Sequence, residues 1–260
     1  KNIYKTFNPG TINEKVALNG LSLKLNEGDF VTVIGGNGAG KSTMLNAVAG
    51  VWPVDEGQII IDGTDVTKLS EHKRAAYLGR VFQDPMTGTA ATMGIEENLA
   101  LAKRRGKTRV LRPGITKTER EEYKELLKIL DLGLEDRLTS KVGLLSGGQR
   151  QALTLLMATL QKPKLLLLDE HTAALDPKTA AKVLDITDRI VNRDHLTTLM
   201  ITHNMKDAIA HGNRLIMMMN GRIVLDIQGE EKKKLTVKQL LDKFEEASGE
   251  EFSNDSAILG

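Results

Sequence analysis

The sequence predicts an α/β fold with a mainly parallel central sheet, an antiparallel β subdomain and a helical subdomain. Three observations lead to this class. A glycine-rich loop separates an apolar run from a helical pattern, a second apolar run ends in two carboxylates, and strand and helix patterns alternate along most of the 260 residues. Continuous apolar runs are typical of parallel strands covered on both faces.

The glycine-rich loop follows an apolar run at residues 30–34 and precedes a helical pattern that starts at Lys41. It fits G-x-x-x-x-G-K-[ST], the motif of a P-loop NTPase. Its backbone N–H groups and the positive end of the new helix would bind phosphates, Lys41 would reach the β- and γ-phosphates, and Ser42 would ligate Mg²⁺. The predicted nucleotide-binding residues here are Gly35, Gly36, Asn37, Gly38, Ala39, Gly40, Lys41, Ser42 and Thr43. The sequence therefore predicts binding of a nucleoside triphosphate with Mg²⁺, as in a kinase, a GTPase or an ATPase.

The whole chain suggests one main domain with a smaller lobe. We expect residues 1–228 to form the ATP-binding domain, with a helical subdomain inserted at about 84–160, and residues 229–260 to form a helical tail. The net charge of +2 is too small to indicate nucleic-acid binding, and the absence of cysteine excludes disulfides. No apolar run approaches the roughly 18 residues that span a bilayer, so work at a membrane would need a partner.

The first part of the chain shows strand patterns. Residues 21–25 alternate as a half-buried strand, and residues 26–29 turn the chain back. The helix that starts at Lys41 should end at Trp52-Pro53. Residues 58–61 are expected to form a strand before a tight turn, and residues 79–83 another strand that ends near Asp84-Pro85.

The middle of the chain is helical in pattern from about residue 95 to 132. Within it, residues 119–130 carry an apolar stripe. A basic run at residues 103–112 would suit phospholipid headgroups or an acidic partner surface, although such runs more often form solvated loops.

The second half alternates helices and buried strands. Helices are expected at 150–161 and 177–192, and strands at 165–170 and 197–202. The first of these strands ends in Asp169 and Glu170, and the second is followed by His203. Asn220-Gly221 predicts a hairpin between strands 214–219 and 222–227. Thr236 and Gln239 have capping-box spacing before a final helix.

One pentapeptide separates the possible P-loop classes. This pentapeptide, Leu145-Ser146-Gly147-Gly148-Gln149, occurs together with Gln83, the strand at 165–170 that ends in two carboxylates, and His203. The set resembles the ATP-binding subunit of an ABC transporter of the importer type. The resemblance runs from about residue 7 to 227 and covers most of the chain.

The resemblance implies roles for residues outside the P-loop. Phe7 would stack on adenine with Val16 beside it, and Tyr4 is a nearby alternative for the aromatic position. Asp169 would hold Mg²⁺ together with Ser42 and Gln83. Catalysis would fall to three residues, namely Glu170, which orients or deprotonates the attacking water, and His203 and Lys41 at the γ-phosphate.

The same resemblance implies a dimer that sandwiches two ATP molecules. Ser146, Gly147, Gly148 and Gln149 would bind the γ-phosphate held by the opposite copy, because a hydroxyl and N–H groups at a helix start form an anion site. Asp176 belongs to the loop that would communicate across the dimer.

Two positions depart from the family pattern. Gly36 stands where many members have proline, which should loosen the loop slightly without removing a phosphate donor. His171 stands where proline is common after the catalytic glutamate, as a turn substitution or as a residue that acts on Glu170. A subgroup with histidine there resembles importers of small solutes such as aromatic amino acids.

The leading hypothesis is an ATPase that powers import of a small solute such as an amino acid. Its partners would be transmembrane permease subunits, a second copy of itself and a solute-binding protein, with no direct nucleic acid, at the cytoplasmic face of the membrane. The alternative is a soluble ABC-type ATPase acting on nucleic acid or ribosomes. A phosphotransferring kinase is a third possibility, but it leaves residues 145–149 and His203 without a role.

Overall fold

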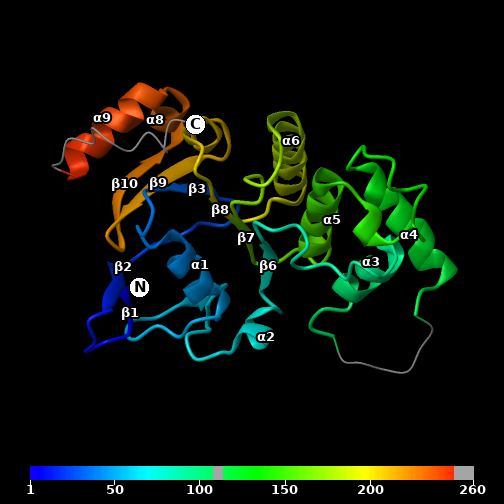
Figure 1. The fold of residues 1–260 in the computed structure, drawn as a ribbon, viewed down its shortest axis with the longest axis horizontal. Coiled ribbons are helices and arrows are strands. Elements are labelled where there is room, and N and C mark those ends of the chain that lie inside the picture. Colours follow the sequence, from blue (N-terminus) through cyan, green and yellow to red (C-terminus); the bar gives the residue numbers. More distant parts are fainter. Residues whose placement is uncertain (108–113, 249–260) are drawn as a thin grey trace.

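The computed structural model describes residues 1–107 and 114–248 (Figure 1). The strands are β1 Ile3–Phe7, β2 Lys15–Leu21, β3 Phe30–Ile34, β4 Ile60–Ile61, β5 Thr64–Asp65, β6 Leu78–Val81, β7 Leu165–Asp169, β8 Thr198–Ile201, β9 Arg214–Met219 and β10 Arg222–Gln228. The helices are α1 Lys41–Ala49, α2 Glu71–Arg74, α3 Ile95–Lys103, α4 Lys117–Lys128, α5 Gly147–Thr159, α6 Pro177–Asp194, α7 Met205–Ala210, α8 Gly229–Lys233 and α9 Val237–Ser248, with a 3₁₀ turn at Val142–Leu144.

The central sheet has six strands in the order β10-β9-β3-β8-β7-β6. All neighbours are parallel except β10 and β9, which form the antiparallel hairpin predicted from Asn220-Gly221. Strands β3, β7 and β8 are almost wholly buried, as their apolar runs predicted. Because β3, β7 and β8 are parallel neighbours, the P-loop, Glu170 and His203 all follow strand ends at one edge of the sheet. The α/β class with a mainly parallel sheet is confirmed.

The antiparallel part is smaller than expected and differs in position. Two separate hairpin sheets, β1–β2 and β4–β5, make it up. The prediction of a strand at 21–25 is wrong. Strand β1 pairs with β2 at Lys15–Leu21, and this pairing ends where the predicted strand would begin. The strand predicted at 58–61 is shorter, since β4 spans only Ile60–Ile61 before the expected turn.

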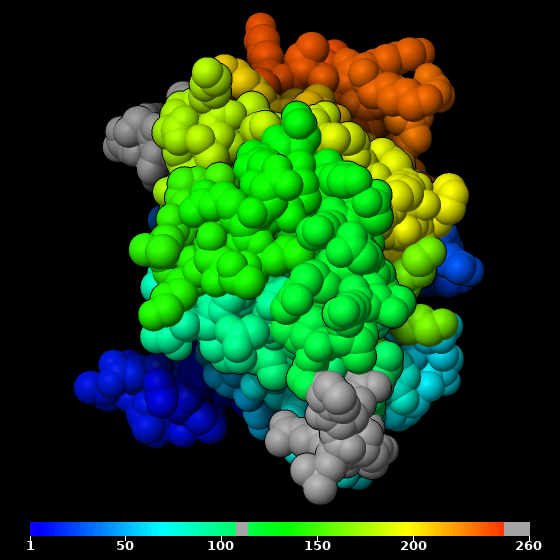
Figure 2. Space-filling view, turned by 90° about the vertical axis from the view of Figure 1, so that its right-hand side faces the viewer, coloured from blue at the N-terminus to red at the C-terminus, as the bar shows by residue number. Residues whose placement is uncertain are grey.

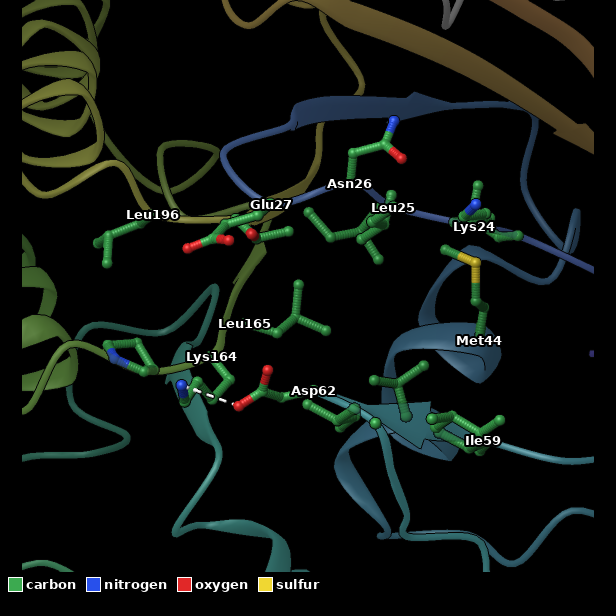
Figure 3. A pocket seen from close by; sticks show the side chains of 18 of the residues that line it. Lys24, Leu25, Asn26, Glu27, Met44, Ile59, Asp62, Lys164, Leu165 and Leu196 are labelled. Atoms are coloured by element: carbon green, nitrogen blue, oxygen red, sulfur yellow. Dashed lines mark ion pairs between the residues drawn. The ribbon is translucent and has the colours of Figure 1, made fainter.

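The side chains of the mispredicted segment border a cavity of about 730 Å³ (Figure 3). Leu25 faces Met44 of α1 and Ile59 across this space, and Leu165 lies at the start of β7. An ion pair of 2.8 Å between Lys164 and Asp62 stands at its margin. The cavity therefore lies at the amino end of β7, on the opposite edge of the sheet from the P-loop.

The predicted helical lobe is formed by α3, α4 and α5. Their buried apolar residues, among them Leu99, Tyr123, Leu127 and Leu153, share one core with the sheet. This lobe occupies the centre of the face in Figure 2. Helix α4 spans Lys117–Lys128, close to the predicted 119–130. Of the basic run at 103–112, residues 108–112 lie outside the described part of the chain.

The C-terminal helices α8 and α9 lie on the opposite side of the molecule from α3 and α4 (Figure 1). The predicted capping box is confirmed, because Thr236 Oγ1 accepts from the Gln239 N–H at 3.3 Å and Gln239 accepts from the Thr236 N–H at 2.9 Å. Leu240 and Phe244 of α9 pack into a core cluster with Met205 of α7. Of the predicted tail, residues 249–260 lie outside the described part. Within the residues described, no helix is both long and apolar enough to cross a bilayer.

Lys232 of α8 is buried, with 2% of its surface exposed. Its ammonium donates to the carbonyls of His211 and Gly212, just after α7. Burial lowers the pKa of Lys232 to about 8, against the opposing effect of the Asp188 carboxylate. The C-terminal helices are thus tied to the end of α7 by a buried cation.

This buried lysine predicts a pH-dependent stability. Between pH 8 and its ordinary pKa near 10.4, Lys232 is deprotonated in the folded chain and protonated in the unfolded one, so the free energy of unfolding should rise with pH by about 1–3 kcal/mol. Below pH 8 both states are protonated and the contribution is constant. Denaturant unfolding at pH 7, 8.5 and 10 should show this rise in the unaltered chain and in Lys233→Met, but not in Lys232→Met. Equal pH slopes in all three would contradict the prediction.

Candidate nucleotide and catalytic site

The P-loop has the backbone conformation that its glycines predict. Gly35, Gly38 and Gly40 have φ values of 147°, 81° and 100°. A Cβ on Gly35 would lie 2.3 Å from the Met218 carbonyl, and one on Gly40 would lie 2.5 Å from the Ala17 carbonyl. Larger residues at these two positions would therefore both strain the backbone and clash with it. Gly36 has open space around it and needs no such conformation, which agrees with proline being common there in the family.

Lys41 is the first residue of α1 and is buried against the loop. Its Nζ donates to the carbonyls of Gly35 at 2.6 Å and Gly36 at 3.1 Å. Burial lowers the pKa of Lys41, while the Glu170 and Asp169 carboxylates oppose that shift. The loop thus holds a partly desolvated cation that is ready to pair with phosphate oxygens.

Glu170 follows β7 and His203 follows β8, and the two side chains meet. His203 Nε2 lies 2.6 Å from Glu170 Oε1, with the glutamate side chain 10% exposed and the histidine 48% exposed. Glu170 has φ 47°, a left-handed conformation that is uncommon outside glycine. The two predicted catalytic side chains are therefore in direct contact.

A cavity of about 310 Å³ joins these parts. It is lined by Phe7, Lys15, Ala17, Asn37, Gly38, Ala39, Gly40, Lys41, Ser42, Thr43, Glu170 and His203. Backbone donors, two lysines, two hydroxyl-bearing residues and a carboxylate–imidazole pair thus line one space. Donors suit a phosphate chain, and a carboxylate beside it suits activation of a water molecule.

Of the residues predicted to contact adenine, Phe7 has the most suitable position. Its ring lines the cavity and meets the Trp52 ring edge-on, with centroids 5.0 Å apart. Tyr4 packs instead over Gly20, where a Cβ would lie 2.8 Å from the tyrosine oxygen. Val16 is 49% exposed and lies on β2 between the lining residues Lys15 and Ala17. The contact of Phe7 and Val16 with adenine stays a prediction.

The residues predicted to hold Mg²⁺ fit a hard cation only in part. Ser42 lines the cavity, and Asp169 directly precedes Glu170. Burial raises the pKa of Asp169, and Arg80, whose guanidinium lies 3.5 Å from the carboxylate, opposes that shift. Among the residues described, no cluster of three or more metal-ligating side chains exists. Ser42 and Asp169 suit an ion that takes its remaining oxygens from phosphate and water.

Gln83, the third predicted metal ligand, is exposed in the loop after β6 and does not line the cavity. Its preceding residue is tied down, because the Phe82 carbonyl accepts from Gln151 Nε2 at 3.1 Å. The metal role of Gln83 is therefore not supported by the cavity and stays a prediction.

The residues predicted to form the second anion site cap α5 and do not line the cavity. Ser146 caps α5, accepting from the Gln149 N–H at 3.2 Å, while Gln149 accepts from the Ser146 N–H at 3.1 Å. Neither of these residues, nor Gly147 or Gly148, lines the P-loop cavity. Asp176 caps α6 by accepting from the Thr179 N–H at 3.1 Å, and it also lies outside the cavity.

Two charged residues at the site had no motif to reveal them. Arg80 on β6 donates to Asn46 Oδ1 at 2.7 Å and lies 3.5 Å from the Asp169 carboxylate. An arginine within the predicted strand at 79–83 was the one signal for it. Lys15 lines the cavity, with its Nζ 3.4 Å from where a Cβ of Gly38 would lie. Its exposed position in a turn-rich segment offered no signal.

Lys15 predicts a second cation for the nucleotide phosphates. Because the lysine is exposed, Lys15→Gln should raise the KM for ATP only about two- to fivefold, with kcat unchanged. The effect should shrink as salt rises. Steady-state hydrolysis at two salt concentrations measures it, with Lys24→Gln at the other cavity as the control. Equal KM values for the two variants would contradict the prediction.

The fold and this site define a nucleotide-binding ATPase cassette. A family model described as ABC transporter matches residues 18–173. The chain therefore belongs to the ABC transporter family, and it is an ATPase.

Relatives of known name support this membership. A tyrosine transport ATP-binding protein of Clostridioides difficile (strain R20291) is 48% identical over 253 residues, which cover 95% of this chain and 98% of that protein. A methionine import ATP-binding protein MetN of Rhizobium johnstonii is 37% identical over 212 residues, covering 80% of this chain and 56% of that protein.

Solved structures show the same fold. A dimeric structure of the ATP-binding cassette MJ0796 in a post-hydrolysis state, bound to ADP and Pi, matches with a TM-score of 0.73 and 30% identity, covering 88% of this chain and 97% of that one. The ADP conformation of MJ1267, an ATP-binding cassette of an ABC transporter, matches with a TM-score of 0.76 and 26% identity over 94% of this chain and 96% of that one.

Proposed function

We propose that this chain powers the import of a small solute by hydrolysing ATP as a dimer beneath membrane-embedded permease subunits. The observation that carries the proposal is the contact between Glu170 and His203 beside the P-loop cavity. Import is favoured because relatives that match most of this chain are named import ATP-binding proteins.

Hydrolysis follows from what each side chain can do. The P-loop N–H groups and Lys41 would hold the phosphates and balance their charge, which supplies most of the catalysis of phosphoryl transfer. Glu170 would take a proton from, or orient, a water molecule that attacks the γ-phosphorus. His203, in contact with Glu170 at 2.6 Å, would hold that carboxylate and reach the γ-phosphate. Mg²⁺, when bound through Ser42 and Asp169, would neutralise charge on the phosphate oxygens.

A second copy would complete each site. Ser146 and the N–H groups at the start of α5 would form an anion site, and these residues do not line the chain's own cavity. In a two-fold dimer, this site of one copy can meet the P-loop of the other. The dimeric MJ0796 structure supports such a pairing for this chain.

The cargo we propose is an aromatic amino acid. The support is the relative named as a tyrosine transport protein, which matches 95% of this chain at 48% identity. A separate solute-binding protein would deliver the amino acid to the permease, and the chain would lie at the cytoplasmic face of the membrane.

Purification of the tagged chain from gently solubilised native membranes tests the proposal. We expect a stoichiometric integral membrane protein to co-purify, and the complex in vesicles to take up labelled tyrosine only with ATP. Recovery with ribosomes or nucleic acid and no membrane protein would overturn the transport function and favour a soluble ABC-type ATPase. Uptake of another solute would correct the cargo alone.

A further inference from the structure

The backbone of the catalytic glutamate needs support. Glu170 has φ 47°, a conformation that a residue with a side chain keeps only when its surroundings hold it. Its N–H donates to the Ile201 carbonyl at 3.1 Å, and its own carbonyl accepts from the Ala173 N–H at 2.9 Å. The direction of the carboxylate therefore depends on how firmly the turn after β7 is anchored.

His171, the next residue, anchors this turn to α6. It is 2% exposed, and its Nε2 lies 3.1 Å from Thr187 Oγ1. The single hydroxyl proton of Thr187 goes to the Val183 carbonyl at 2.8 Å, so Oγ1 must accept the hydrogen bond from His171. His171 therefore carries a proton on Nε2, the ring nitrogen that donates to Thr187.

Helix α6 also contacts the segment that follows His203. Asp188, next to Thr187, lies 2.7 Å from His211 Nδ1, just after the end of α7. Helix α7 itself begins immediately after His203 and Asn204. Two adjacent residues of α6, Thr187 and Asp188, therefore contact the segments that follow Glu170 and His203.

From this geometry we infer that His171 is a positioning residue for Glu170, and that Thr187 is its anchor. The inference rests on the catalytic role proposed for Glu170. The inference also explains why histidine is accommodated at this place. A proline would fix the turn through its own restricted backbone, whereas the histidine ring fixes it by a hydrogen bond to α6.

A pair of Thr187 variants of the full chain tests the inference. Thr187→Val removes the acceptor with little change of shape, whereas Thr187→Ser keeps it. We expect Thr187→Val to lower kcat about tenfold with KM for ATP unchanged, and Thr187→Ser to stay within about twofold of the parent chain. Equal kcat values for the two variants, or a loss that appears in KM, would overturn the inference.

A double variant separates positioning of Glu170 from general loosening of the fold. In a Glu170→Gln chain there is no carboxylate to position, so adding Thr187→Val should change the residual rate by less than about twofold. A further tenfold loss in that background would overturn the inference. If Glu170→Gln alone left hydrolysis unchanged, the role proposed for Glu170 would fail instead.

A spectroscopic readout does not depend on activity or on any variant folding. In the unaltered chain with ¹⁵N-labelled histidine, the His171 ring should show a proton on Nε2 at pH 7. A ring protonated only on Nδ1 would overturn the inference.

Discussion

Replacing Glu170 with glutamine is expected to slow ATP hydrolysis by about 10²–10⁴, the scale for loss of a general base. Glutamine keeps the size of the side chain and an oxygen that can face His203, so the loss should come from the missing carboxylate and not from packing. Because no P-loop donor changes, nucleotide affinity should stay near that of the parent chain. Phosphate release at saturating Mg-ATP and a nucleotide titration measure the two quantities.

The same variant should accumulate as an ATP-bound dimer. In the proposed mechanism ATP favours closure of the dimer and hydrolysis resets it, so a chain that binds but does not hydrolyse should remain closed. Size-exclusion chromatography with ATP should show the dimer in Glu170→Gln, and Glu14→Gln, far from the catalytic pair in sequence, serves as the control. Rapid turnover by Glu170→Gln, or a monomer at saturating ATP, would count against the proposed mechanism.

The P-loop was predictable because its information is local. Nine consecutive residues carry the turn, the cation and the hydroxyl, and the observed positive φ values at Gly35, Gly38 and Gly40 are what such a loop needs. The placement of Glu170 and His203 at one edge of the sheet was also predictable, since each follows a buried strand. Their catalytic roles were implied by the family resemblance and stay a prediction. Their contact at 2.6 Å was not predictable, because it depends on β7 and β8 being neighbours in the sheet.

Other features depended on partners that the sequence does not show. Residues 21–25 alternate like a strand, but a strand also needs a neighbour, and β1 pairs with residues 15–21 instead. The choice between Phe7 and Tyr4 depended on the same pairing, which turns Tyr4 onto Gly20 and leaves Phe7 at the cavity. Lys15 had no motif at all, and only the position of β2 beside the P-loop brings it to the site.

The start of α5, where we propose an anion site, does not line the P-loop cavity of its own chain. We therefore predict how two inactive variants behave alone and together. Lys41→Ala removes the phosphate cation, and Ser146→Arg blocks the start of α5 with a large side chain. Each variant alone should hydrolyse ATP at less than about one-hundredth of the parent rate, because every site in its dimer lacks one half. A mixture of the two should recover activity.

The amount of recovery follows from the symmetry of the dimer. In a mixed dimer one site carries both lesions, whereas the other combines the intact Lys41 of one copy with the intact Ser146 of its partner. Random exchange makes about half of the dimers mixed, each with one of two sites intact, so the mixture should reach up to about one quarter of the parent rate. Hydrolysis measured as the mixing ratio is varied should peak near equal amounts.

A matched control shows whether a peak in activity arises because residues of two copies complete one site. Mixing Lys41→Ala with Glu170→Gln should recover nothing, because both residues line the same cavity of one chain and each mixed dimer then carries one lesion in each site. If Lys41→Ala and Ser146→Arg also failed to complement, the start of α5 would act within its own chain or not at all. Recovery in the first mixture and not in the second would require that Ser146 serve the P-loop of the other copy.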